Sequence, residues 1–143
     1  MYGPEDNFDP KSSHVIAALI KKIYEAKKLG KKEIVVWGNG SATREFFYVE
    51  DAARAIVLAT EKYDKPDPIN IGAGFEISIK KLTQMLVKLM DFKGKIIWDK
   101  TKPNGQPRRM IDTSKAKKEF DFNAQIKFET GLKKTIDWYY KNF

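Results

Sequence analysis

The chain has 143 residues, of which 42% are hydrophobic and 13% aromatic, so it is large enough for one domain with a hydrophobic core. It contains no cysteine and a single histidine, which excludes disulfides, thiolate metal sites and a cysteine nucleophile within these residues and argues against a metal centre. The formal net charge of +8 favours an anionic partner, with nucleic acid, nucleotides and phosphosugars all open.

Apolar residues at helical spacing, together with capping residues, predict five helices. In chain order these are residues 13–29, capped by Ser12 or Ser13; 52–62, capped by Asp51; the segment between its cap Ser78 and Gly94; 112–120; and 129–140. In the second helix Ala55, Ile56 and Ala59 form a narrow face able to pack closely on a sheet. In the last helix we expect Leu132, Ile136, Tyr139 and Tyr140 to be buried.

Short runs of β-branched and aromatic residues predict strands between these helices. The predicted strands are 33–37, 69–71 and 95–98, with extended segments at 44–49 and 125–128. Glycine turns follow the first two strands, at 38–41 and 72–74, and the proline-containing segment 99–109 is predicted to be a loop. The order indicates one α/β domain (mixed α+β) over residues 1–143. No strand–GxGxxG–helix unit occurs, and the 72–74 turn is too short for a dinucleotide loop.

The chain has no run of about 18 uncharged apolar residues, so we expect no membrane span. The residues after Met1 have neither the basic nor the apolar region of a secretory signal. We therefore expect a cytoplasmic protein.

Three features are candidates for chemistry, and each also has a purely structural interpretation. His14 stands at a predicted helix start, where free N–H groups attract phosphate. Trp37 and Arg44 flank a flexible turn, and such a pair can stack on a sugar or base and bind a diphosphate; alternatively, Trp37 is core and Arg44 is in a surface ion pair. The 102–109 loop offers three cations and two amides on irregular backbone, or it is simply solvated.

Several stretches, in this order and at these spacings, resemble the C-terminal half of the GDP-L-fucose synthases. These enzymes are extended short-chain dehydrogenases/reductases of the NAD-dependent epimerase/dehydratase family. The stretches are YGPEDNFDP followed by SSHVIAALI, VVWGNGSATREFFYVEDAARAI, INIGAG and KPNGQPRRMIDTSKAKKEFDF. The resemblance implies that residues 1–143 are the substrate-binding portion of an extended Rossmann-type enzyme, without its N-terminal dinucleotide-binding sheet.

The resemblance also implies an activity and a set of site residues. The family enzyme epimerises GDP-4-keto-6-deoxy-mannose at C3 and C5 and then reduces the C4 ketone with NADPH, giving GDP-L-fucose. His14 matches its epimerisation acid, which lies near the cofactor, and His14 and Met1 are the implied cofactor contacts. The implied substrate contacts are Lys22, Trp37, Arg44, Asn104 and, as a further diphosphate contact, Arg108.

This sequence departs from the family pattern in one important respect. It lacks the glycine-rich cofactor loop, the Tyr-x-x-x-Lys reductase pair and the catalytic cysteine; Tyr24 and Lys28 have that spacing but lie inside a predicted amphipathic helix. We therefore expect a part of an enzyme that is inactive alone, binds NADP poorly and needs an N-terminal Rossmann half. Apolar surface left exposed on residues 52–62 and 69–71 would favour a homo-oligomer.

Two alternatives to this interpretation stay open. The first alternative is the C-terminal part of another nucleotide-sugar epimerase or dehydratase, acting on a UDP- or dTDP-linked sugar, although the YGPEDNFDP and KPNGQPRR stretches favour the fucose synthases. The chain could also be a stand-alone, non-catalytic domain that uses its net charge of +8 to bind nucleotides or nucleic acid.

Overall fold

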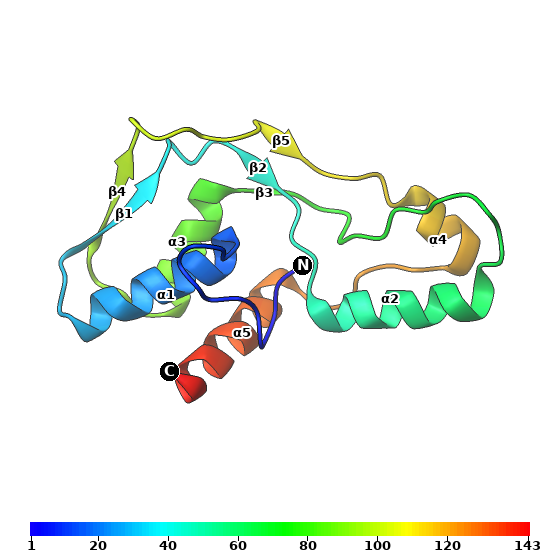
Figure 1. Ribbon diagram of the computed structural model, residues 1–143, viewed down its shortest axis with the longest axis horizontal. Helices are drawn as coiled ribbons and strands as arrows, with labels where there is room; N and C mark the ends of the chain where they lie inside the picture. Colours follow the sequence, from blue (N-terminus) through cyan, green and yellow to red (C-terminus); the bar gives the residue numbers. More distant parts are fainter.

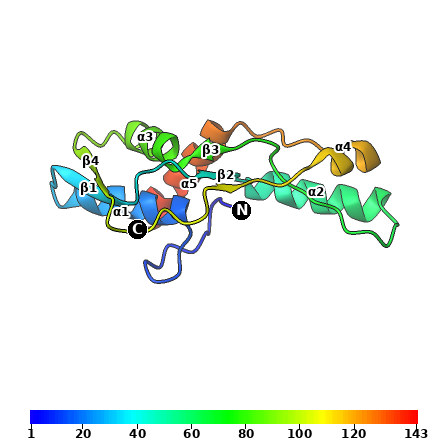
Figure 2. The same cartoon turned by 90° about the horizontal axis from the view of Figure 1, so that it is seen from above.

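A computed structural model describes all residues of the chain, Met1–Phe143, as a mixed α/β fold with five helices and five strands. The helices are α1 (Val15–Lys28), α2 (Val49–Lys62), α3 (Ile79–Leu89), α4 (Ser114–Phe120) and α5 (Phe128–Asn142), and the strands are β1 (Glu33–Trp37), β2 (Thr43–Arg44), β3 (Ile77–Ser78), β4 (Lys95–Asp99) and β5 (Arg108–Arg109). The molecule is elongated: α1, α3, β1 and β4 lie at one end and α2 and α4 at the other (Figure 1). The same division is seen from above (Figure 2).

Two small sheets position the loops that matter for the site. β1 and β4 pair in parallel, with Glu33 opposite Lys95 and Trp37 opposite Asp99. The second sheet has the order β3-β2-β5, with β2 antiparallel to β3 and parallel to β5. Because β2 is central, it brings Arg44 beside the 99–109 loop, which returns to the sheet at β5.

The main core lies between α1, α3, α5 and β1 and holds 18 buried residues. Its fully buried side chains include Ile16, Ile20 and Ile23 of α1 and Leu82 and Leu86 of α3, spaced so that each set faces inward on its helix. The amino-terminal Tyr2 joins this core and donates its hydroxyl hydrogen to the carbonyl of Phe128, at the start of α5, at 3.2 Å. The first residues of the chain are therefore fixed on α5.

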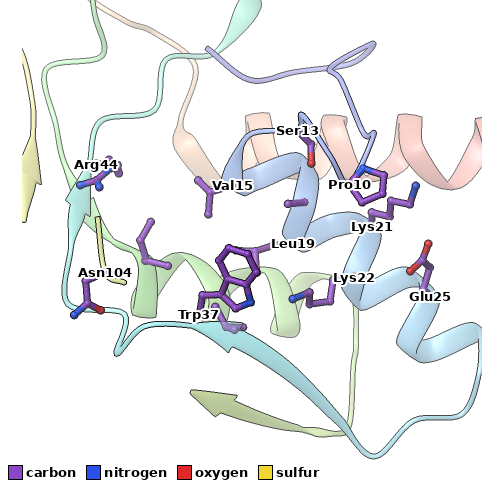
Figure 3. Close-up of a pocket in the computed structure, with 13 residues that line it drawn as sticks. Pro10, Ser13, Val15, Leu19, Lys21, Lys22, Glu25, Trp37, Arg44 and Asn104 are labelled. Carbon is purple, nitrogen blue, oxygen red and sulfur yellow. The ribbon is translucent and has the colours of Figure 1, made fainter. Parts of the chain in front are cut away.

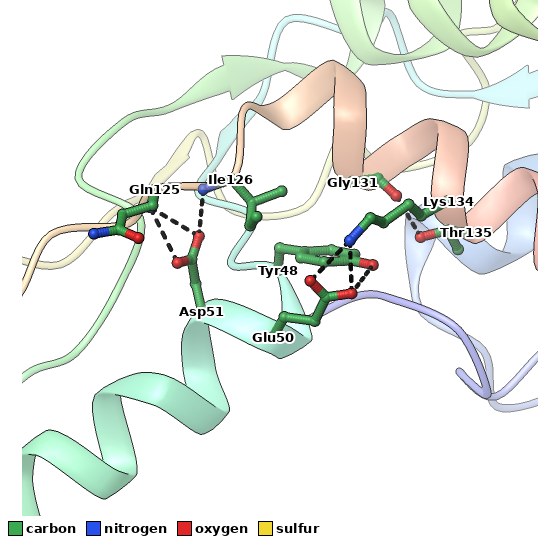
Figure 4. A network of polar contacts seen from close by, with 8 residues as sticks. All are labelled: Tyr48, Glu50, Asp51, Gln125, Ile126, Gly131, Lys134 and Thr135. Atoms are coloured by element: carbon green, nitrogen blue, oxygen red, sulfur yellow. Dashed lines mark hydrogen bonds and ion pairs between the residues drawn. The ribbon is translucent and has the colours of Figure 1, made fainter.

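A second cluster of six buried residues joins α2 to α4 and the segment that follows it. Asp51, in the first turn of α2, is only 2% exposed, and its carboxylate accepts the backbone N–H groups of Gln125 at 3.0 Å and Ile126 at 2.8 Å (Figure 4). It also accepts a hydrogen bond from the guanidinium Nη2 of Arg54 at 2.9 Å. Burial opposes ionisation of this carboxyl, but these hydrogen bonds outweigh it and lower its pKa. Glu50 adds an ion pair with Lys134 of α5 at 2.8 Å.

Several predicted helix boundaries differ from the structure, and in α1, α2 and α3 the reason is that a different residue takes the capping position. His14 is the N-cap of α1 and makes no side-chain cap bond, while the buried Oγ of Ser13 has no hydrogen-bond partner. α2 begins two residues before Asp51, whose side chain faces the 125–126 backbone instead. α3 ends before Gly94, because Asp91 adopts the left-handed conformation, with φ 50°, just after the last helical turn. The Ser78 cap of α3 is confirmed: its Oγ accepts the N–H of Lys81 at 3.2 Å.

The prediction of a strand at residues 69–71 is wrong, because no other strand pairs with this segment. In the segment 44–49, predicted to be extended, Arg44 belongs to β2 and Tyr48 forms a parallel bridge with Tyr2, whereas Val49 already begins α2. The 99–109 loop contains the short strand β5 at its end. The predicted strands 33–37 and 95–98 are confirmed, the latter one residue longer.

Two residues predicted to face the interior are exposed. On α2 the buried positions are Asp51, Ala52 and Ala55, whereas Ile56 is 61% exposed. On α5 Tyr140 is 40% exposed, although Leu132, Ile136 and Tyr139 are buried as predicted. No helix is both long enough and apolar enough to cross a lipid bilayer.

Candidate functional site

A cavity of about 670 Å³ lies between α1, the end of β1, β2 and the loop after β4 (Figure 3). Four of the sequence-predicted substrate contacts line it together: Lys22, Trp37, Arg44 and Asn104. They come from four separate segments of the chain. The fold therefore brings together residues that are up to 82 positions apart (104 minus 22) in the sequence.

The turn after β1 holds Trp37 and Asn104 side by side. Trp37 ends β1 on the solvent-facing side of the strand and is 64% exposed, so the interpretation of this indole as core is wrong. The Oδ1 atom of Asn104 accepts the backbone N–H of Asn39 at 2.7 Å, which leaves its Nδ2 atom free. Gly38 allows this contact, since it has φ 77° and a Cβ there would overlap Oδ1 of Asn104.

Arg44 enters the cavity from β2 with part of its guanidinium already fixed. Its Nη1 atom donates to the carbonyl oxygens of Thr43 and Gln106, both at 2.7 Å, and no carboxylate pairs with it. The alternative role of Arg44 in a surface ion pair is therefore not found. Its Nε and Nη2 atoms remain available, in the planar arrangement that suits a phosphate.

Two lysines add positive charge near Trp37. Lys22, on α1, donates to the carbonyl of Val35 at 2.6 Å, and burial lowers the pKa of its ammonium. Lys102 lies with its Nζ atom 5.8 Å from the centre of the Trp37 ring, within the range of a cation–π contact. The cavity thus combines an exposed aromatic face with cationic side chains.

A second cavity, of about 530 Å³, adjoins the first and shares Val15 and Arg44 with it. Met1 and His14, the predicted cofactor contacts, both line this second cavity. His14 is exposed at the start of α1. Arg44 therefore connects the cavity that holds the predicted substrate contacts with the one that holds the predicted catalytic histidine.

Arg108 is the predicted contact that the structure does not bring to either cavity. Its Nε atom donates to both carboxylate oxygens of Glu76, at 2.8 and 3.1 Å, and Glu76 also accepts the hydroxyl hydrogen of Thr43 at 2.7 Å. These bonds hold Arg108 on the β3-β2-β5 sheet. Its neighbour Arg109, one of the three cations of the 102–109 loop but not among the implied contacts, lines the second cavity instead.

Glu45 was also missed by the sequence analysis. Its Oε1 atom accepts the backbone N–H groups of Ala73 at 2.5 Å and Gly74 at 3.0 Å, and Oε2 accepts that of Ile111 at 3.1 Å. These partners lie 28 to 66 residues away, so the sequence could not show them. Glu45 follows Arg44 in one of the stretches that carry the family resemblance, but that resemblance implied no role for it.

The same contacts decide how well these residues fit a dinucleotide cofactor. A pyrophosphate is usually held by free N–H groups of a glycine turn. In the 72–74 turn, however, the N–H groups of Ala73 and Gly74 are bound to Glu45. The 72–74 turn therefore offers no free N–H groups to a pyrophosphate, and we assign no step to the cofactor within this chain.

Comparison with known proteins places this fold and site in a family. The sequence model of the NAD dependent epimerase/dehydratase family matches residues 1–72, and the chain belongs to this family. Within it, the chain is a homologue of the GDP-L-fucose synthases. It is 43% identical over 142 residues to GDP-L-fucose synthase 1 of Arabidopsis thaliana and 36% identical over 151 aligned positions to GDP-L-fucose synthase of Escherichia coli, in each case over 99% of this chain.

Solved structures show the same similarity to the GDP-L-fucose synthases. A GDP-L-fucose synthetase from Naegleria fowleri, crystallised bound to NADP, superposes with a TM-score of 0.93 at 30% sequence identity over 99% of this chain. The chain spans less than half of each of these proteins: 44% of the Arabidopsis protein, 47% of the E. coli protein and 44% of the Naegleria structure. The mixed α/β fold inferred from the sequence is thus confirmed as matching part of a GDP-L-fucose synthase.

Proposed function

We propose that residues 1–143 form the GDP-sugar-binding part of a GDP-L-fucose synthase. This enzyme would epimerise GDP-4-keto-6-deoxy-mannose at C3 and C5 and reduce its C4 ketone with NADPH, giving GDP-L-fucose. One observation carries the proposal: Lys22, Trp37, Arg44 and Asn104, from four segments, line one cavity. A homologous sequence would preserve the residue types, but their convergence on a single cavity supports a shared role in binding.

The chemistry of the first cavity suits a nucleoside diphosphate. The exposed face of Trp37 can stack on a flat ring, and the free Nε and Nη2 atoms of Arg44 can bind a diphosphate through two parallel hydrogen bonds. Lys22 adds a second cation, and the free amide of Asn104 adds a donor beside Trp37. The guanosine and diphosphate groups of the ligand are therefore proposed to occupy this cavity.

The sugar would extend from Arg44 into the second cavity, because the two cavities share that side chain. There it would meet His14, whose exposed imidazole can donate a proton to the sugar during epimerisation. We propose His14 as this acid. Arg108, bound to Glu76, would contact the diphosphate only after leaving that ion pair.

The complete reaction also needs groups that these residues do not contain. We propose that an N-terminal Rossmann half supplies the cofactor loop, the tyrosine and lysine of the reductase and the second epimerisation residue. NADPH, when bound there, supplies the hydride. Residues 1–143 alone are then expected to bind the GDP-sugar without converting it.

Calorimetric titration of the purified chain tests this proposal. We expect GDP to bind with modest affinity and NADPH to give almost no heat, because the 72–74 turn offers no free phosphate-binding N–H groups. Trp37→Ala and Arg44→Ala should each abolish the GDP signal, whereas Lys118→Ala, an exposed residue on α4, should leave it unchanged. Binding of DNA with a steep salt dependence and without a preference for GDP would contradict the proposal and support a nucleic-acid-binding domain.

A further inference from the structure

Glu45 connects three parts of the chain around the second cavity. Its carboxylate accepts the backbone N–H groups of Ala73 and Gly74, in the 72–74 turn, and of Ile111. Its own backbone N–H donates to the carbonyl of Arg109 at 3.0 Å. The side chain is half-buried and forms no ion pair, so all of its hydrogen bonds go to backbone amides. Glu45 therefore fixes the position of main-chain segments and does not balance a cation.

The segments that Glu45 fixes are the walls of that cavity. The cavity is lined by Ile71 and Gly72, at the start of the 72–74 turn, and by Arg109, Met110 and Ile111, at and after β5. None of the first-cavity residues Lys22, Trp37 and Asn104 is hydrogen-bonded to Glu45. Glu45 thus acts on one of the two adjoining cavities, the one that also contains His14.

Gly72 packs closely against Glu45 and Ile111, with no space for a side chain. A Cβ atom on Gly72 would overlap Oε1 of Glu45 and lie 3.0 Å from its Cδ and 3.1 Å from Cδ1 of Ile111. Any side chain at position 72 must therefore displace the carboxylate or the 111 segment. A substitution at Gly72 and one at Glu45 should disturb the same cavity wall from opposite sides.

Both oxygens of the Glu45 carboxylate are needed for these contacts. Both oxygens accept hydrogen bonds, Oε1 from two amides and Oε2 from one. A glutamine of the same length has a single accepting oxygen, and its NH₂ group would face at least one backbone donor. Glu45→Gln therefore leaves backbone N–H groups without a partner and should release one of the two segments.

We propose that Glu45 is a positioning residue for the sugar end of the ligand. By holding the 71–74 and 109–111 segments, it sets the shape of the cavity in which the sugar meets His14, and it does not contribute to binding of the nucleotide. This inference rests on the proposed function, in which GDP occupies the first cavity and the sugar the second.

The test compares two probes, GDP and GDP-mannose, by calorimetry on the full chain. For Glu45→Gln we expect the Kd for GDP to stay within about twofold of wild type and that for GDP-mannose to rise about tenfold. Gly72→Ala should reproduce this split. Asp51→Asn is the matched control, because Asp51 also accepts backbone N–H groups but lines neither cavity. It should lower the melting temperature and leave the ratio of the two Kd values unchanged.

Each result has a definite meaning. A changed ratio in Glu45→Gln and Gly72→Ala, with an unchanged ratio in Asp51→Asn, supports the positioning role. If Glu45→Gln loses stability but keeps the wild-type ratio, as the control does, Glu45 is only structural and the inference is overturned. If the wild-type chain binds GDP but the variants lose both ligands equally, the inference fails and the proposed function stands. A wild-type chain that binds neither probe overturns both.

Discussion

The carboxamide oxygen of Asn104 accepts the backbone N–H of Asn39 at 2.7 Å, and this bond ties the loop after β4 to the turn after β1. Asn104 lines the first cavity and is held there by a residue 65 positions away in the sequence. The contact depends on Gly38, whose φ of 77° and missing side chain admit the Asn104 amide. The site is therefore built on a loop–loop contact as well as on helices and strands.

The Asn104 side chain has two proposed functions: its oxygen holds the loop through Asn39, and its free amide is a donor to the ligand. Substitutions at this position should separate them. Asn104→Ala removes the bond to Asn39 and should weaken GDP binding about fivefold, since a hydrogen bond contributes about 1 kcal/mol. Asn104→Asp keeps the accepting oxygen and should hold the loop in place, as melting curves with and without GDP would show. Equal melting temperatures for wild type and Asn104→Ala, with unchanged GDP affinity, would mean that the tether has no role.

Asp51 should make the stability of the chain depend on pH in the acid range. Its pKa in the folded chain is lowered, because hydrogen bonds from Gln125, Ile126 and Arg54 outweigh the effect of burial. A carboxyl with a folded pKa below its unfolded value of about 3.9 stabilises the fold fully above that pH, and this contribution is lost as the pH falls through the folded pKa. Urea unfolding at pH 7, 4 and 3, as set points, would follow this loss.

The Asp51→Asn variant isolates this effect. At neutral pH it should unfold more easily by about 1–3 kcal/mol, because the side chain loses an acceptor for buried backbone donors. Its free energy of unfolding should then fall less steeply with acid than that of wild type. A wild-type and a variant curve that run parallel down to pH 3 would contradict the assignment.

Gly131 is predicted to resist substitution despite its place in a helix. Gly→Ala in a helix ordinarily stabilises by about 0.5–1 kcal/mol. Here a Cβ would overlap the hydroxyl of Tyr2 and lie 2.8 Å from Cδ2 of Tyr48, so we expect a loss of about 1–3 kcal/mol in urea unfolding. Tyr2→Phe in the Gly131→Ala background should recover part of that loss. A stabilised Gly131→Ala chain would show that Tyr2 does not pack on α5 in this way.

The exposed face of α2 should cause the isolated chain to self-associate. Ile56 and Val57 are 61% and 56% exposed on adjacent positions of this helix. We propose that a second copy of the chain covers them and that, in a complete enzyme, the N-terminal half takes its place. Sedimentation at high micromolar concentration should show a dimer or larger species, which Ile56→Lys should shift toward monomer. A wild-type chain that is monomeric throughout would refute this proposal.

Local patterns predicted the elements of this fold better than its long-range contacts. The strands β1 and β4 follow from their β-branched and aromatic residues, and the five helices from apolar spacing and capping residues, because these are local signals. Residues 69–71 have strand-like composition but no neighbouring strand, and the capping positions of α1 and α2 depend on side chains that bind elsewhere.

The same limit applies to the candidate site. His14 could be singled out by its place at a predicted helix start, and Trp37 and Arg44 because they flank one glycine turn. The resemblance to a family added Lys22 and the particular role of Asn104. The role of Glu45 could not be predicted, because its partners are backbone amides in two distant segments. A backbone amide does not depend on the side chain of its residue, so the sequence does not mark it as a partner. The ion pair that holds Arg108 away from the cavities is likewise a product of the β3-β2-β5 sheet.

Titration of the ¹⁵N-labelled chain with GDP shows directly whether these residues bind the nucleotide of a GDP-sugar in the first cavity. We expect the largest amide shifts at Trp37–Gly40, Arg44 and Asn104, together with a shift of the Trp37 indole N–H, and almost none along α4. Shifts confined to basic surface residues such as those of α4, or no shifts at millimolar GDP, would contradict binding in this cavity.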